Sequence, residues 1–294
     1  MNRWLVAVNH RAGRHSISPQ VVRDAVSAAG VEFDMIAPTT SSEMVEIIKS
    51  EAYRGRTHFA LAGGDGTVSL AIDTLMRMDL DQQPVIGVLP TGTGCDLLRT
   101  FGISQDLGEA ARHLSGTEIY VIDVPYLDGA WGRRYFVNVA QTGVGAAAAQ
   151  TAPRLSRRMG SARYPIAFAG RLLRFPKAEI TLVTERRTIE SEALAVILAN
   201  AQFFAGGWNV APKATLIDGV LDIQIIDTPK RNAPTLVPKV VKGTHLGDKA
   251  VRRLAAAEFE MTVSRVWPVE ADGDYLGNTN ITGRVIPAAI KLKI

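Results

Sequence analysis

The stretch Gly63-Gly64-Asp65-Gly66-Thr67 decides how this chain folds and what it can bind. It follows the apolar run His58-Phe59-Ala60-Leu61-Ala62 and precedes the helix-compatible residues 68–72, so it predicts a turn from a strand into a helix. Glycines let the backbone approach an anion, and the N-terminus of the next helix directs N–H groups at it. Asp65 would repel phosphate unless a cation lay between them. The pentapeptide therefore predicts a Mg²⁺-nucleotide site, with a glycine turn capped by Asp65 as the purely structural alternative.

The composition is that of an ordinary globular protein. The chain has 294 residues, 47% hydrophobic and 21% charged, which allows one or two domains with a large core. The single cysteine, Cys95, excludes an intrachain disulfide and favours a cytoplasmic location. No apolar segment reaches the roughly 18 residues of a membrane span. Residues 1–8 read as a first strand rather than a signal peptide.

Positive charge is concentrated in the middle of the chain. No acidic residue lies between Asp128 and Glu179, whereas the basic residues there are Arg133, Arg134, Arg154, Arg157, Arg158, Arg163, Arg171, Arg174 and Lys177. Apolar residues recur at helical spacing among the arginines of 155–175, which predicts a basic amphipathic helix. We expect residues 154–177 to contact an anionic membrane surface, with a solvated basic face and core packing as the alternatives. No nucleic-acid-binding motif accompanies the charge, so no nucleic acid partner is expected.

The first 118 residues alternate between strand and helix patterns. Apolar strands are expected at 4–8, 31–37, 59–62 and 84–89, and helices follow each of them. Ser18-Pro19 marks one helix start, and Ser41 or Ser42 is expected to cap the next helix. Such alternation predicts a mostly parallel sheet with helices on both faces, which binds ligands at the carboxyl ends of its strands.

The rest of the chain changes to successive strands. Strand patterns occur at 119–124, 135–139, 180–184, 193–198, 221–226 and 258–263, with hairpin signals at Asp128-Gly129 and Glu185-Arg186-Arg187. Strands without intervening helices predict an antiparallel β-sandwich. The expected domains are therefore an α/β nucleotide-binding domain at 1–122, to which strand 285–294 returns, and a β-sandwich domain for the lipid substrate at 123–284.

A second loop, Leu89-Pro90-Thr91-Gly92-Thr93-Gly94-Cys95-Asp96, repeats the small residues, hydroxyls and acid of the first. One further motif precedes these loops, at 9–13, and three follow them, at 205–212, 216–222 and 270–277. Together they resemble the catalytic-domain family of diacylglycerol kinases, which includes sphingosine and ceramide kinases and many bacterial lipid kinases. The resemblance covers nearly the whole chain. It implies a first domain similar to phosphofructokinase and NAD kinase, a β-sandwich second domain, and ATP-dependent phosphoryl transfer to a lipid hydroxyl.

The resemblance also implies which residues bind the nucleotide and the metal. The ATP-binding positions would be Asn9, Arg14, Thr39, Thr40, Gly63, Gly64, Asp65, Gly66, Thr67, Val68, Ser69, Gly92, Thr93 and Gly94. A catalytic Mg²⁺ would be held, largely through water, by Asp65, Asp96 and Asp123. A separate structural Mg²⁺ would bind Asp218 and the backbone carbonyls of Thr215 and Val220.

The catalytic base implied by the family is the Glu of an Asp-Gly-Glu segment, and this chain has Asp274 there. The shorter side chain is a departure, with Asp272 as the second candidate and a hairpin-turn acid as the structural alternative for Asp274. Two further departures are His10 in place of a proline and Cys95 in place of an asparagine. Cys95 is interpreted as a small buried residue rather than a reactive thiol.

The function expected from these residues is a Mg²⁺-dependent kinase acting on a diacylglycerol-like lipid, cytoplasmic and transiently bound to the membrane. Sphingoid bases are the second acceptor class. One alternative is a soluble-metabolite kinase of the NAD kinase type, which shares Gly63 to Thr67. Another is a nucleotide-binding regulatory protein whose catalytic site has drifted. The oligomeric state is left open, with a homodimer as one option.

Overall fold

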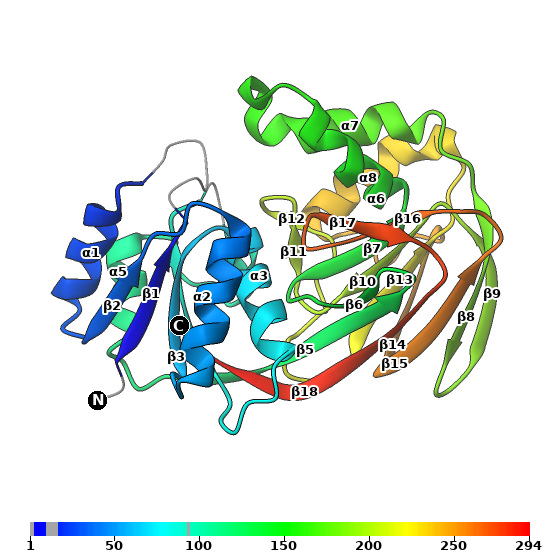
Figure 1. The fold of residues 1–294 in the computed structure, drawn as a ribbon. Helices are drawn as coiled ribbons and strands as arrows, with labels where there is room; N and C mark the ends of the chain where they lie inside the picture. The colour runs from blue at the N-terminus through cyan, green and yellow to red at the C-terminus, as the bar shows by residue number, and fades with distance from the viewer. Residues whose placement is uncertain (1–2, 10–16, 93–94) are drawn as a thin grey trace. The chain divides into compact units, whose positions relative to one another are not determined.

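The computed structural model describes residues 3–9, 17–92 and 95–294, which divide into two compact units (Figure 1). Unit 1 comprises Met1–Asp123 and Pro287–Ile294, and unit 2 comprises Val124–Ile286. Two strands, β5 (Tyr120–Gly129) and β18 (Ile281–Lys293), contain residues of both units.

Unit 1 is built on a parallel sheet. Its strands run in the order β2 (Phe33–Ile36), β1 (Trp4–Val8), β3 (His58–Gly63), β4 (Val85–Pro90) and the end of β18, each parallel to its neighbours. The helices are α1 (Pro19–Ala28), α2 (Ser41–Tyr53), α3 (Asp65–Met76), α4 (Asp96–Thr100) and α5 (Leu107–His113). Helix α1 packs beside α5 and α2 beside α3, on opposite faces of the sheet (Figure 1). The predicted α/β class is confirmed.

The helix starts follow capping chemistry. At α1 the Ser18 hydroxyl accepts a hydrogen bond from the Gln20 N–H at 3.2 Å, as the Ser-Pro signal predicts. At α2 the prediction was wrong, because Thr40 and not Ser41 or Ser42 is the capping residue. The Thr40 hydroxyl accepts from the Glu43 N–H at 3.1 Å, and the Glu43 carboxylate accepts from the Thr39 N–H at 2.7 Å. This reciprocal arrangement is similar to a capping box, with Thr40 as the cap and Glu43 three residues later. The Glu43 carboxylate accepts from Thr39, the residue before the cap.

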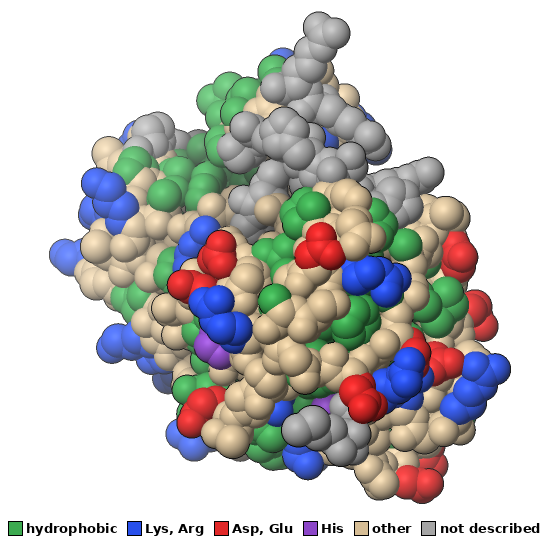
Figure 2. Space-filling model, turned by 90° about the vertical axis from the view of Figure 1, so that its left-hand side faces the viewer, with side chains coloured by type: hydrophobic (Ala, Val, Ile, Leu, Met, Phe, Trp, Pro, Cys, Tyr) green, Lys and Arg blue, Asp and Glu red, His purple; other side chains and the backbone are tan. Residues whose placement is uncertain are grey.

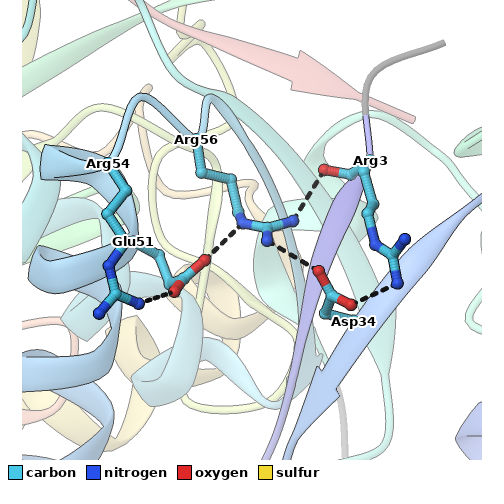
Figure 3. A network of polar contacts seen from close by, with 5 residues as sticks. All are labelled: Arg3, Asp34, Glu51, Arg54 and Arg56. Carbon is cyan, nitrogen blue, oxygen red and sulfur yellow. Dashed lines mark hydrogen bonds and ion pairs between the residues drawn. The ribbon is translucent and has the colours of Figure 1, made fainter.

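Acidic and basic side chains lie interspersed over the face of the molecule drawn in Figure 2. Within unit 1, a network of charged side chains joins Asp34 of β2 and Glu51 of α2 through arginines that lie just outside the strands and helices (Figure 3). Arg56 lies at its centre, 2.8 Å from both Glu51 and Asp34, and it also donates to the Arg3 carbonyl at 3.1 Å. Because the Arg56 side chain is only 18% exposed, this network is screened less by solvent than an isolated surface pair.

Unit 2 contains two antiparallel sheets. The first has the order β18, β15 (Glu258–Val263), β8 (Ala178–Thr184) and β9 (Thr188–Ala193). The second has the order β14 (Val251–Ala256), β13 (Leu221–Ile226), β10 (Ala195–Ala199), β7 (Val139–Gly143), β16 (Pro268–Ala271) and β17 (Asp274–Asn278). Short strands β11 (Phe203–Phe204) and β12 (Trp208–Asn209) pair separately, and β6 (Gly132–Tyr135) forms a hairpin with β5. The predicted antiparallel sandwich is confirmed.

The central strand β10 shows how the layers of unit 2 are made. Val196 and Leu198 enter the core between the two sheets, which also contains Trp267 and Phe259. Ile197, pointing the other way, enters a second core against the helices. These helices are α6 (Val144–Thr151), α7 (Arg163–Leu172) and α8 (Ala233–Lys242), with the short 3-10 turns Ala152–Arg154, Arg157–Ala162 and Lys230–Asn232 beside them. A strand buried on both faces is uniformly apolar, as β10 is.

Two features of unit 2 differ from the expectation. The predicted strand 135–139 is interrupted at 136–138, because backbone N–H groups there donate to the Asp272 carboxylate instead of a neighbouring strand. Helix α8 was not predicted, since Pro238 lies inside it. Among the described residues, no helix has both the length and the apolar character that crossing a bilayer requires.

Candidate active site

Two loops lie side by side at the carboxyl edge of the unit 1 sheet. Strands β3 and β4 are paired up to Gly63 and Pro90, so the loops that follow them emerge together. The Thr91 N–H donates to the Gly63 carbonyl at 3.1 Å. A Cβ on Gly92 would lie 2.9 Å from the Gly64 Cα, so only glycine allows this approach. The pairing of β3 with β4 therefore places the two motifs next to each other.

The N-terminus of α3 is suited to an anion. Gly64 occupies its capping position and has no side chain with which to cap the helix. The first N–H groups of a helix lack partners within the helix and carry partial positive charge. A backbone formed by glycines and an uncapped helix start therefore fits a phosphate group, which supports this part of the predicted ATP site.

Asp65 connects the two loops. Its Oδ1 accepts from the Asp96 N–H at 2.8 Å and from the Leu97 N–H at 3.3 Å, so it caps the N-terminus of α4. At the preceding position, Gln105 donates to the Cys95 carbonyl at 3.1 Å and accepts from the Cys95 N–H at 3.2 Å. The Gln105 amide thus holds the backbone of this loop at Cys95. Burial is the main cause that raises the pKa of the Cys95 thiol far above its ordinary value, and the nearby Asp65 charge raises it further.

The remaining nucleotide positions divide into three groups. Asn9 is brought to the first loop, where its Nδ2 donates to the Thr67 hydroxyl at 3.0 Å. The Thr39 and Thr40 hydroxyls form the capping box of α2, and the side chains of Val68 and Ser69 are buried. The predicted positions Arg14, Thr93 and Gly94, and His10 with them, lie outside the described residues.

The candidate magnesium acids have separate partners. Asp96 forms an ion pair with Arg99, and the Asp123 Oδ1 accepts from the Ala288 N–H at 2.8 Å. Within the described part of the chain, no three His, Cys, Asp or Glu side chains converge as direct ligands would. A Mg²⁺ ion keeps several waters and binds substrate phosphates, so the aspartates fit such an ion through water rather than as a closed cage.

The predicted structural metal position in unit 2 is an exposed turn. The Val220 N–H donates to the Asp218 Oδ1 at 3.2 Å, and Gly219 between them has φ of 73°. Thr215 is half-buried and precedes this turn. The Asp218 side chain therefore stabilises the turn that the predicted site requires.

The candidate base stands at a two-residue hairpin in unit 2. Asp272 and Gly273 have φ of 49° and 91°, and β17 begins at Asp274. The Asp272 carboxylate accepts from the N–H groups of Val137, Asn138 and Val139 at 2.8, 2.9 and 3.1 Å. Three backbone donors hold this carboxylate in place, so the Asp272 side chain ties the hairpin turn to the backbone at 137–139.

Asp274 is oriented differently from Asp272. Its side chain is 64% exposed, and its Oδ2 lies 3.0 Å from Nη2 of Arg134, whose side chain is only 12% exposed. Arg134 belongs to β6 and is therefore held by the β5–β6 hairpin. The Asp274 carboxylate is therefore accessible from solvent and is oriented by Arg134.

Glu270 lies directly before this turn and is fully buried. Its Oε1 accepts from Gln141 Nε2 at 2.9 Å, and its Oε2 accepts from the Gly273 N–H at 2.8 Å. Gln141 Nε2 also donates to the Tyr164 hydroxyl at 3.2 Å. Burial raises the pKa of Glu270 to about 8, and burial likewise raises the pKa of Tyr164. This buried polar chain joins the hairpin to the helical layer of unit 2.

An apolar cavity lies between the second sheet and the helices of unit 2. Its volume is about 60 Å³, and its wall includes Val139, Ile197, Phe168, Trp208 and Leu236. Since one water-sized group needs roughly 10–15 Å³, the space suits about four to six such groups. Its walls are almost entirely apolar, so hydrocarbon fits it better than water. The polar side chains Gln141 and Tyr164 reach the same cavity.

The sequence did not predict three residues of this site, Gln141, Tyr164 and Glu270. The signal available was weak: Glu270 stands between the apolar residues Val269 and Ala271 in a strand whose buried members are otherwise hydrophobic. A charged residue within an apolar run indicates a function or a partner. Its side-chain partner Gln141 belongs to β7, far away in sequence, and Gln141 in turn contacts Tyr164 of α7.

Two family models match the chain. Residues 3–126 match the diacylglycerol kinase catalytic domain, and residues 138–294 match the YegS C-terminal NAD kinase beta sandwich-like domain. Among curated relatives, a diacylglycerol kinase of Bacillus subtilis (strain 168) is 25% identical, covering 94% of this chain and 91% of that protein. A diacylglycerol kinase of Mycobacterium tuberculosis is 28% identical, covering 85% and 84%.

Further likeness appears in a probable lipid kinase YegS-like protein of Chromohalobacter salexigens, which is 27% identical over 98% of this chain and 92% of that protein. Among solved structures, a putative diacylglycerol kinase from Bacillus anthracis str. Sterne has a TM-score of 0.82 with 17% identity, covering 99% of this chain and 96% of that one. The fold of both units therefore has an experimentally solved counterpart.

Proposed function

Since this chain belongs to the diacylglycerol kinase catalytic-domain family of lipid kinases, we propose that it transfers the γ-phosphoryl group of ATP to the hydroxyl of a diacylglycerol-like lipid in a Mg²⁺-dependent reaction. The nucleotide would bind unit 1. Its phosphates would contact the backbone from Gly63 to Thr67 and the loop at Gly92, where a side chain would collide with the neighbouring backbone. Asp65 and Asp96 would hold waters of the ion, which supplies charge neutralisation for the transferred group.

The apolar cavity of unit 2 is the observation that carries the lipid assignment. Kinases of water-soluble metabolites have no need for an apolar chamber, whereas an acyl chain gains about 0.8 kcal/mol for each methylene removed from water. The cavity is joined to the Asp272–Asp274 hairpin through Tyr164, Gln141 and Glu270. We assign Asp274 as the base that accepts the proton of the lipid hydroxyl, with Asp272 and Arg134 positioning it.

Membrane contact is the next part of the proposal. Around α7, the buried Ala167 and Leu172 face the core, whereas Met159, Ile166 and Leu173 are exposed. Exposed basic side chains accompany them, namely Arg154 and Arg174; the side chains of Arg157 and Arg158 are not among those described. Lys177 is instead paired with Glu192 and Asp227. Apolar side chains beside arginines suit the interface of an anionic bilayer, so the cytoplasmic protein would bind the membrane transiently.

The decisive experiment measures transfer of labelled phosphate from ATP, with Mg²⁺, to a mixed lipid extract. We expect one labelled lipid with the wild type and at least a hundredfold less with Asp65→Ala or Asp274→Ala. Asp81→Ala, at an exposed position, is the matched control and should keep full activity. Equal product from Asp65→Ala would refute the site. Label in a water-soluble acceptor would indicate the NAD kinase type, and nucleotide binding without transfer would indicate a drifted regulatory protein.

A further inference from the structure

The Tyr164 hydroxyl is a hydrogen-bond donor without a close acceptor in the wall of the cavity. Both hydrogens of the Gln141 amide are used, one toward Glu270 at 2.9 Å and one toward Tyr164 at 3.2 Å. The Tyr164 oxygen therefore accepts, and its own hydrogen must be directed elsewhere. The acceptor found for it among the described residues is the Gly145 carbonyl at 3.5 Å. That separation exceeds the 2.5–3.0 Å of an ordinary hydroxyl hydrogen bond.

The structure gives the Gln141 amide one orientation, with its nitrogen toward both Glu270 and Tyr164. A Cβ on Gly145 would lie 1.9 Å from the Gln141 Oε1, so the amide oxygen is packed directly against the start of α6. The amide nitrogen faces the buried Glu270 carboxyl group. The Tyr164 ring is fixed as well, packed edge-on against Phe204 and Trp208 at centroid distances of 5.5 and 5.4 Å. The donor is thus held rigidly in place.

We propose that the Tyr164 hydroxyl donates to an ester carbonyl oxygen of the lipid and thereby selects ester-linked glycerolipids over ether-linked or sphingoid lipids. This inference rests on the proposed function, since it takes the cavity as the acyl-chain site. In a glycerolipid the ester is the polar group where the acyl chain begins, only a few bonds from the free hydroxyl. Three hydrogen bonds connect Tyr164 through Gln141 and Glu270 to Gly273, next to Asp274. An ester at Tyr164 is therefore on the base side of the cavity.

The test is a binding measurement that requires no phosphoryl transfer. Dioctanoylglycerol and its dioctyl ether analogue are titrated into the full chain, and tryptophan fluorescence is followed, because Trp208 lines the cavity next to Tyr164. We expect the wild type to bind the ester about tenfold more tightly, the effect of one neutral hydrogen bond. In Tyr164→Phe, ester binding should weaken to the level of the ether, and ether binding should stay within twofold.

Tyr126→Phe is the matched control, since Tyr126 is a partly buried tyrosine of unit 2 that packs on Tyr135 away from the cavity wall. It should keep the ester preference. Retention of that preference by Tyr164→Phe would overturn the proposal, as would equal weakening of both ligands, which would indicate a packing role. Equal binding of the two lipids by the wild type, or binding of neither, would overturn it too. Absence of phosphoryl transfer with the ester preference intact would refute the kinase assignment alone.

Discussion

Replacing Glu270 by glutamine should change how the stability of unit 2 depends on pH. Glu270 is fully buried, and its oxygens accept from Gln141 and from the Gly273 N–H. Burial raises its pKa from 4.5 to about 8, so the folded chain keeps a proton that the unfolded chain loses. A group that binds its proton more tightly when folded stabilises the fold less and less as pH rises from its unfolded pKa to its folded pKa. Glu270→Gln removes this titration while keeping the size of the side chain.

The magnitude follows from the two pKa values. With 1.36 kcal/mol for each pKa unit, ionisation of Glu270 costs the wild type about 1 kcal/mol at pH 5, about 3 at pH 7 and about 4 at pH 8. The glutamine adds a constant cost, because one of its two oxygen positions becomes an NH₂ group facing a donor, about 1–2 kcal/mol at any pH. The unfolding free energy of Glu270→Gln minus that of the wild type should therefore rise by about 3 kcal/mol from pH 5 to pH 8.

Urea unfolding at pH values from 5 to 8, followed by tryptophan fluorescence, measures this difference. The signal reports mainly on unit 2, which contains Trp131, Trp208 and Trp267. Glu260→Gln is the control, since Glu260 is exposed on β15 and its variant should follow the wild type at every pH. A constant difference between Glu270→Gln and the wild type across this range would refute the reasoning.

Three more changes have defined outcomes. Gly92→Ala should lower the unfolding free energy by about 2 kcal/mol in thermal melts, because its Cβ would meet the backbone of Gly64. The control Gly66→Ala has open space around its Cβ and should not lower the unfolding free energy. Arg56→Met should cost about 1 kcal/mol in urea unfolding, with a smaller effect in 1 M salt; an effect independent of salt would contradict an electrostatic origin. Arg174→Glu should weaken co-sedimentation with phosphatidylserine vesicles about thirtyfold, at about 1 kcal/mol per charge, while the exposed Arg186→Glu should not.

The sequence was most informative where local pattern and chemistry agree. In unit 1, glycines, a strand and a helix stand next to one another in the chain, so the position of both phosphate-type loops followed from the order of residues alone. Strand β10 could be read in the same way from its apolar run, and both predicted hairpins exist, at Asp128-Gly129 and at Glu185-Arg186-Arg187. These features depend on neighbours within a few residues.

Features that depend on distant partners could not be read from the chain. The interruption after Tyr135 exists because Asp272, more than 130 residues later, takes three backbone N–H groups. Tyr164 meets Gln141 through the packing of α7 on the second sheet, and no spacing in the sequence indicates that contact. Helix α8 could not be predicted because proline disfavours a helix. The helix forms because its apolar face is buried in the helical core, which offsets the free-energy cost of the prolines.

The burial of Cys95 has a practical consequence for studying this protein. It is the sole thiol of the chain, it is fully enclosed, and its raised pKa keeps it protonated and unreactive at neutral pH. Maleimide or nitroxide reagents should therefore leave the wild type unmodified, without any need to replace the native cysteine. A cysteine introduced at an exposed position such as Leu173 or Tyr275 would then carry a label as the single reactive group, ready to report on vesicle contact or on lipid entry.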